Sequence, residues 1–250
     1  MNIDKYSDNN IFKTDPSKIH SIYEDSLRFL PNLRKDSRVL EIWPWDWSYS
    51  IFISNEFGIK MSNFDLIDMS KSVVHDLKNS NLTMEFNCYL SDTIDFLKKN
   101  KKAYDLIVMR SIIEHMDKQY INILVDLLVK SLTANWQIFI ETPNLLNSFI
   151  GIPMFYSDYS HQTWFTSKSI FDAFYWNTEE KILIKSYNYI KKVKHGWITF
   201  FIKDLLRYFI ESISTINTFI NHRIYWSLSK DINIVYTPLL ITTINKKNDK

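Results

Sequence analysis

Short apolar runs alternate with amphipathic stretches along most of the chain. The apolar runs predict β-strands, and the stretches between them, whose apolar residues recur at helical spacing, predict helices. This alternation is typical of βα units around a parallel sheet. The predicted strands are 38–42, 63–68, 84–88, 105–109 and 137–141, and the predicted helices are 49–57, 71–78, 93–99 and 118–132.

Further elements extend this plan toward both ends. Asp15 and Pro16 have the character of a helix N-cap and first helical residue, and they predict a helix over 15–30 that stops at Pro31. Two more apolar runs, at 181–187 and 234–243, predict the last two of seven strands. The sequence therefore predicts an α/β fold with a mostly parallel sheet and helices on both faces.

A long amphipathic segment, about 197–226, separates the last two predicted strands. Its apolar residues form one helical stripe, whereas Lys203, Asp204, Arg207 and Glu211 lie off it. We expect this helical insertion to pack its stripe on the sheet. A substrate lid, a dimer face or contact with a membrane surface through 198–222 are the alternatives. The stripe consists of Ile202, Leu205, Leu206, Phe209, Ile210, Ile213, Ile216 and Ile220.

Length and charge narrow the class of protein. The 250 residues suffice for one sizeable core, so we expect a single domain over 1–250 with its central part at 37–187. Lys+Arg 30 against Asp+Glu 28 gives a net charge of +2 without a dense basic stripe, so we expect no nucleic-acid partner. The lone Cys88 and the scattered histidines lack metal-ligand spacing, so we expect neither a disulfide nor a metal.

The first ten residues are polar and lack the apolar core of a signal peptide. No uninterrupted apolar run reaches the length of about 18 residues that a spanning helix needs. We therefore expect a cytoplasmic protein, with peripheral membrane contact as an option. The sequence does not indicate the oligomeric state.

Glycine is scarce and tryptophan abundant. There are three glycines and eight tryptophans, where average usage of about 7% predicts roughly seventeen glycines. An α/β fold needs glycine for tight turns and for close backbone approach. The shortage therefore requires an explanation.

The first predicted strand runs into a turn rich in tryptophan. Val39-Leu40-Glu41-Ile42 precedes Trp43-Pro44-Trp45-Asp46-Trp47, and in nucleotide-binding α/β folds this first turn holds the ligand. The segment resembles motif I of class I S-adenosylmethionine-dependent methyltransferases, an acidic residue followed by a glycine-x-glycine-x-glycine loop. The resemblance extends from about residue 20 to residue 243 and implies a Rossmann-like fold.

Further motifs continue this resemblance in the family's order. Ile67-Asp68-Met69-Ser70 resembles the end of the second strand, and 86–96 resembles the third, with Asp92. Residues 104–115 resemble the fourth strand with its Glu114-His115 pair, 137–144 the fifth strand with a Thr-Pro-Asn exit, and 158–165 a substrate-side segment with His161. Asp65 competes with Asp68 for the second-strand position, and we favour Asp68 because Asp-x-Ser follows the strand.

The resemblance implies a role for each of these residues. S-adenosyl-L-methionine is the implied cofactor, with Asp68 on its ribose, Asp92 on its adenine, and Glu41 ordering the loop or reaching the amino group through water. The implied cofactor contacts comprise Glu41, Trp43, Trp45, Trp47, Asp68, Asp92 and Arg110. His161 is the candidate base for the acceptor's proton, and His115 shapes the floor of the pocket. The implied acceptor is a small molecule, a sugar or a lipid-linked molecule.

The family's loop glycines fall on Trp43, Trp45 and Trp47. Trp136 also stands where the family turns into its fifth strand through glycine, and Trp176 where a helix should end in a C′ glycine. We interpret these five tryptophans as UGA codons that the source organism reads as glycine. The alternative is a catalytically dead binding or scaffold protein whose cofactor loop the three indoles block.

Overall fold

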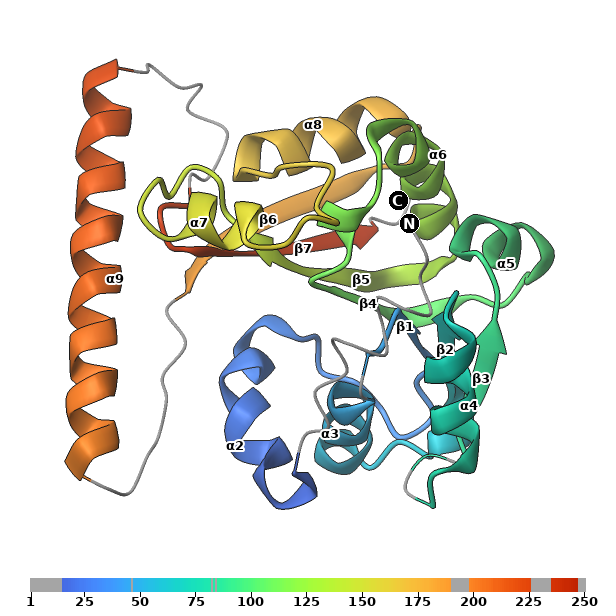
Figure 1. Cartoon of the computed structure of the whole chain (residues 1–250). Coiled ribbons are helices and arrows are strands. Elements are labelled where there is room, and N and C mark those ends of the chain that lie inside the picture. The colour runs from blue at the N-terminus through green and yellow to red at the C-terminus, as the bar shows by residue number, and fades with distance from the viewer. Residues whose placement is uncertain are drawn as a thin grey trace.

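The structure, a computed structural model, describes residues 15–45, 47–81, 83, 85–189, 198–225 and 235–246. Seven strands form one sheet in the order β3-β2-β1-β4-β5-β7-β6 (Figure 1). Strands β1 to β5 pair in parallel, and β7 pairs antiparallel with both β5 and β6. The strands are β1 (Val39–Ile42), β2 (Phe64–Asp68), β3 (Asn87–Leu90), β4 (Tyr104–Arg110), β5 (Leu132–Pro143), β6 (Ile182–Tyr189) and β7 (Leu239–Lys246).

Helices cover both faces of the sheet because its strands bury apolar residues on both sides. In β1, Leu40 and Ile42 pack toward α5, α6 and α8, whereas Val39 packs toward α2, α3 and α4. The predicted Rossmann-like α/β fold is therefore confirmed. The α-helices are α2 (Ile19–Tyr23), α3 (Ser48–Phe57), α4 (Lys71–Asn79), α5 (Thr93–Lys99), α6 (Lys118–Lys130), α7 (Gly151–Tyr156), α8 (Ser167–Asn177) and α9 (Ile198–Tyr225).

The boundaries differ from the prediction in several places. Strand β5 starts at Leu132, five residues earlier than predicted. The N-terminal helix is α2 flanked by two 3₁₀ turns, at Pro16–Lys18 and Glu24–Phe29. The third strand starts at Asn87, three residues later than predicted, because Phe86 N–H closes a turn on the carbonyl of Thr83. The last strand starts at Leu239, directly after Pro238, which has no N–H to donate to a ladder.

Helix α9 overturns the expectation that its apolar stripe packs on the sheet. Glu211, Ser214 and Thr218 are buried, and the described members of the stripe are exposed. Figure 1 shows α9 at one side of the molecule, beyond α7 and over neither face of the sheet. The two core clusters lie between the sheet and the shorter helices, and the described residues of α9 contribute to neither of them. The exposed stripe residues are Leu206, Phe209, Ile210, Ile213, Ile216 and Ile220.

Candidate active site

The loop after β1 holds three tryptophans in left-handed backbone conformations. The φ angles of Trp43, Trp45 and Trp47 are 54°, 52° and 59°. Side chains with a Cβ rarely adopt this region, whereas glycine enters it without a steric penalty. Trp43 N–H donates to the carbonyl of Ile67 (2.8 Å), and Trp47 precedes the first turn of α3. The backbone thus follows the path of a glycine-rich loop.

The three indoles occupy different surroundings. Trp43 packs against the core on one side of the sheet, where its Nε1 is buried without a hydrogen-bond partner. Trp47 packs against the core on the other side. The ring of Trp45 lies 6.2 Å from the ring of His115, centroid to centroid. Trp45 therefore bridges the loop and the buried histidine.

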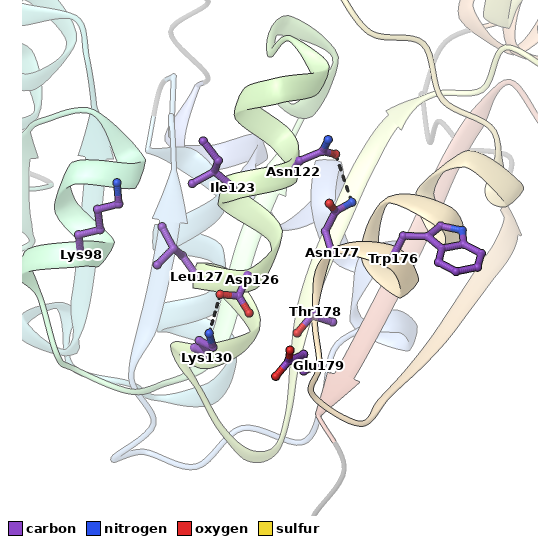
Figure 2. A pocket seen from close by; sticks show the side chains of 10 residues that line it. All are labelled: Lys98, Asn122, Ile123, Asp126, Leu127, Lys130, Trp176, Asn177, Thr178 and Glu179. Atoms are coloured by element: carbon purple, nitrogen blue, oxygen red, sulfur yellow. Dashed lines mark hydrogen bonds and ion pairs between the residues drawn. The ribbon is translucent and has the colours of Figure 1, made fainter.

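Trp136 and Trp176 do not adopt a glycine-like backbone. Trp136 is part of strand β5, Trp176 is inside helix α8, and neither has a positive φ. The prediction that Trp176 stands at a helix C′ position is wrong, because the helix continues to Asn177 and its C-cap Thr178 is extended. Figure 2 shows Trp176 beside a pocket of about 620 Å³ between α6 and α8, and it is 76% exposed.

Glu41 and Asp68 flank the loop on β1 and β2. Glu41 is buried and accepts a short hydrogen bond from the hydroxyl of Ser50, which ties β1 to α3. The Asp68 carboxylate is buried at the carboxyl end of β2 and accepts from the Ser70 N–H (2.7 Å). Its place at the strand end, beside the loop, supports the assignment of the ribose contact to Asp68.

Asp65 belongs to a separate hydrogen-bond network. Its carboxylate accepts from the Tyr104 hydroxyl (2.6 Å) and from Lys102 Nζ (2.9 Å). This contact with Asp65 raises the pKa of Lys102, although burial acts in the opposite direction. Asp65 therefore has a structural role within the sheet, and the competing ribose assignment loses support.

Asp92 is the N-cap of α5. Its Oδ1 accepts from the Asp95 N–H (3.1 Å) and its Oδ2 from the Tyr120 hydroxyl (2.8 Å). Burial and this contact with Asp92 raise the pKa of Tyr120. Both carboxylate oxygens thus have protein partners, and the capping role explains this aspartate without a ligand.

Arg110, at the end of β4, forms an ion pair with Glu141 (3.1 Å). Its guanidinium lies over the rings of Tyr23 and Tyr49, 4.7 and 4.5 Å from their centroids. Glu141 and the two rings raise the pKa of Arg110 against the effect of burial. Arg110 therefore links α2 and α3 to the strand ends, and its predicted contact with the cofactor stays a prediction.

Glu114 and His115 are both buried in the 3₁₀ turn that follows β4. Glu114 Oε2 accepts from the Thr142 hydroxyl (2.9 Å), whereas Oε1 is buried without a hydrogen-bond partner. Burial raises the pKa of Glu114 to about 8. The Ser160 hydroxyl donates to Asp158 (2.6 Å), so His115 Nδ1–H donates to Ser160 Oγ (2.7 Å). Burial lowers the pKa of His115 to about 4, so this ring is neutral at neutral pH.

His161 reaches the same place from the segment after β5. Its ring centroid lies 4.6 Å from that of His115. Because a carbonyl oxygen only accepts, His161 Nδ1–H donates to the carbonyl of Phe155 (2.6 Å). This bond fixes the neutral tautomer in which Nε2 carries the lone pair. The side chain is partly exposed, and the role of Nε2 as a base stays a prediction.

Among the described residues, Glu114, His115 and His161 could also hold a metal ion, since one ligand atom of each lies within 4.8 Å of the others. Their sequence spacing gives no sign of this, because the two segments meet only through the fold. The backbone carbonyl of Glu114 accepts from the N–H groups of Gln162 and Thr163, which fixes that meeting. Sequence analysis missed this contact, and no local pattern signals it.

Two asparagines fix the start of the segment that carries His161. Asn144 Nδ2 donates to the carbonyls of Val235 and Thr237, and Asn147 Nδ2 donates to that of Tyr236. Gly151 follows at a close approach, since a Cβ there would lie 1.8 Å from the carbonyl oxygen of Asn144. Residues 144–165 are therefore anchored to the segment before β7 on one side and to Glu114 on the other. We refer to these residues as the acceptor loop.

No protein-family model and no curated protein sequence matches the chain. Solved structures do match its fold. A SAM-dependent methyltransferase from Archaeoglobus fulgidus is 17% identical with a TM-score of 0.61, over 97% of this chain and 99% of that one. The N-methyltransferase NodS from Bradyrhizobium japonicum, solved with S-adenosyl-L-homocysteine, is 9% identical with a TM-score of 0.55 and full coverage of both chains. The chain thus has the fold of class I methyltransferases.

Proposed function

We propose that this protein transfers a methyl group from S-adenosyl-L-methionine to a small-molecule, sugar or lipid-linked acceptor, in a form that carries glycine at 43, 45 and 47. The observation that carries the proposal is the left-handed backbone at Trp43, Trp45 and Trp47. That backbone fits a cofactor-binding loop at a strand end. The indoles do not fit, because Trp45 extends to His115.

With glycine in the loop, the residues around it suit the cofactor. The loop N–H groups would hold its amino-acid end and Asp68 would hold its ribose hydroxyls, while Glu41 keeps the loop joined to α3 through Ser50. When bound, the cofactor supplies an electrophilic methyl group. The protein's contribution is alignment of the acceptor and exclusion of water.

His161 is the general base in this proposal. Its Nδ1–H is held by the Phe155 carbonyl, so Nε2 accepts the proton of an acceptor hydroxyl or amine. His115 is neutral and tied to Ser160, and it packs against His161 and keeps that ring in place. His115 is thus a positioning residue.

The second candidate is a binding or scaffold protein that lost its cofactor. The packing of Trp43 and Trp47 in the two cores favours it, because both indoles are accommodated without disturbing the sheet. Mass spectrometry of peptides from the native protein separates the candidates. Glycine at 43, 45 and 47 supports the enzyme, whereas tryptophan there excludes the glycine form and favours the second candidate. At 136 and 176 the backbone itself does not require glycine.

A binding experiment tests the site directly. We expect the chain as written to bind S-adenosylmethionine weakly or not at all in calorimetry, and the triple variant Trp43→Gly, Trp45→Gly, Trp47→Gly to bind it. Hydrogen bonds to a charged group contribute about 1.5–3 kcal/mol, so Asp68→Ala in that variant should weaken binding roughly ten- to hundredfold. Asp65→Asn is the matched control and should change affinity little. A folded triple variant that does not bind refutes the proposal.

A further inference from the structure

Helix α9 turns its polar side to the protein and its apolar side to solvent. On the polar side, the Ser214 hydroxyl donates to Asn147 Oδ1 (2.7 Å), and the Thr218 hydroxyl donates to the carbonyl of Ser214. On the outer side, Phe209, Ile213 and Ile216 are 61%, 48% and 58% exposed. This orientation is the reverse of that in an ordinary surface helix.

The exposed stripe is long and continuous. It extends from Leu206 to Ile220, more than half of the 28 residues of α9. Contiguous apolar patches of this kind on a protein surface mark an interaction site. Among the described residues, no helix has the length and apolar character needed to cross a bilayer. A contact in which α9 lies flat along a partner surface, with its outer side against that surface, is therefore the arrangement to consider.

The net charge of the segment that contains α9 indicates which partner binds the exposed stripe. Residues 191–226 contain six Lys or Arg and two Asp or Glu, a net of +4, whereas the whole chain carries +2. Positive charge is thus concentrated in this segment of the sequence, and the rest of the chain is slightly negative. A twofold dimer through α9 would bring two such segments together, and like charges would oppose it. An anionic lipid surface offers both apolar depth and opposite charge.

Helix α9 is joined to the acceptor loop, so a contact between α9 and a lipid surface also positions that loop. Asn147, which binds Ser214, belongs to the acceptor loop that carries His161. The same loop exposes Phe149, Tyr156 and Tyr159. A surface that receives α9 would therefore lie beside the acceptor loop.

We propose that the outer side of α9 docks on an anionic phospholipid bilayer and holds the acceptor loop at the membrane surface, where a lipid-linked acceptor would be presented. Only this last clause rests on the proposed methyltransferase function. The docking itself rests on the exposed stripe, the charge of the segment and the tether between Ser214 and Asn147.

Vesicle flotation of the full chain tests the proposal. The outer-face variant combines Phe209→Ser, Ile213→Ser and Ile216→Ser. The control variant combines Leu90→Ser, Ile123→Ser and Tyr175→Ser, three side chains that are similarly exposed elsewhere. We expect the wild type and the control to bind phosphatidylcholine vesicles that contain phosphatidylglycerol, about tenfold or more tightly than vesicles of phosphatidylcholine alone. The outer-face variant should lose about a hundredfold in affinity.

Circular dichroism checks that both variants are folded. If the outer-face variant is not folded, the single substitution Ile216→Ser replaces it and should lower the affinity for vesicles severalfold. Absence of flotation by the wild type overturns the proposal, and so does an equal loss in both variants. A wild-type dimer that the outer-face substitutions dissociate, without vesicle binding, assigns the stripe to a second copy instead. Flotation with no cofactor binding by the glycine variant refutes the methyltransferase function and leaves the docking intact.

Discussion

At the scale of single residues, the loop positions 43, 45 and 47 differ from position 176 in backbone conformation. The first three have positive φ, and Trp176 is helical. A residue with a Cβ in the left-handed region costs about 1–2 kcal/mol, whereas glycine inside a helix costs about 1 kcal/mol relative to alanine. The preference between glycine and alanine should therefore reverse between the two kinds of position.

We expect Trp45→Gly to be more stable than Trp45→Ala by about 1 kcal/mol, and likewise at 43 and 47. At 176, alanine should be the more stable replacement by a similar amount. Urea denaturation of each pair measures the difference, and lost indole contacts cancel within a pair. Alanine preferred at all four positions would show that the loop does not have the conformation described.

Glu114 gives stability a pH dependence. Burial raises its pKa to about 8, above the usual 4.5. Between these values the folded state keeps a proton that the unfolded state has released, so stability falls as pH rises from about 5 to 8. Glu114→Gln keeps a neutral side chain of the same shape. The variant should match the wild type near pH 4 and exceed it by about 4 kcal/mol at pH 8, because each unit of pKa shift corresponds to about 1.4 kcal/mol.

Calorimetric melting in the presence of a chelator measures this difference. His115 has the opposite sign, since its lowered pKa removes stability as pH falls from about 6.5 toward 4. His115 is present in both the wild type and Glu114→Gln, so its contribution cancels in the difference between their stabilities. Asp126→Asn, at a partly exposed residue paired with Lys130, is the control and should leave the pH profile unchanged. Parallel profiles for the wild type and Glu114→Gln would mean that Glu114 is ionised in the folded protein.

At the scale of elements, the sequence predicted the βα alternation and the loop with good accuracy. A buried strand such as β4 contains a run of consecutive apolar residues, 106–109, and a local pattern suffices to find it. The outward side of α9 and the meeting of Glu114 with residues 162–163 were not predictable in this way. Both depend on which surfaces the other elements leave uncovered, and periodicity defines an apolar stripe without defining what covers it.

The N-cap of α5 provides a test at this scale. Asp92→Ala removes the bond to the Asp95 N–H and the partner of Tyr120, and it should cost about 1–2 kcal/mol of stability. Asp92→Asn keeps a capping oxygen and should cost less than about 0.5 kcal/mol. Thermal unfolding compares the two. If Asp92→Ala leaves stability unchanged but abolishes cofactor binding in the triple-glycine background, the adenine contact is the main role of this aspartate.

At the scale of the whole molecule, β7 joins the sheet together. It pairs with β5 over Gln137–Pro143 and with β6 over Ile182–Tyr189. We expect a chain that ends at residue 234 to be unfolded or aggregated, because β6 then has no neighbour and β5 has an open edge. Circular dichroism and sedimentation measure this. A chain that ends at Lys246 keeps all of β7 and should behave as the full protein. A soluble, folded 1–234 chain would contradict the expectation.

The position of β7 also affects how the protein is made. Strands β1 to β5 can pair in parallel while the chain is still growing, but β5 and β6 are joined only by a strand synthesised after both. Helix α9, with its apolar side outward, therefore leaves the ribosome before the sheet can close. Long-range pairing of this kind is slow, and apolar surface exposed in the meantime is prone to aggregate. An early encounter of α9 with a surface that covers its stripe would shield the unfinished chain during this interval.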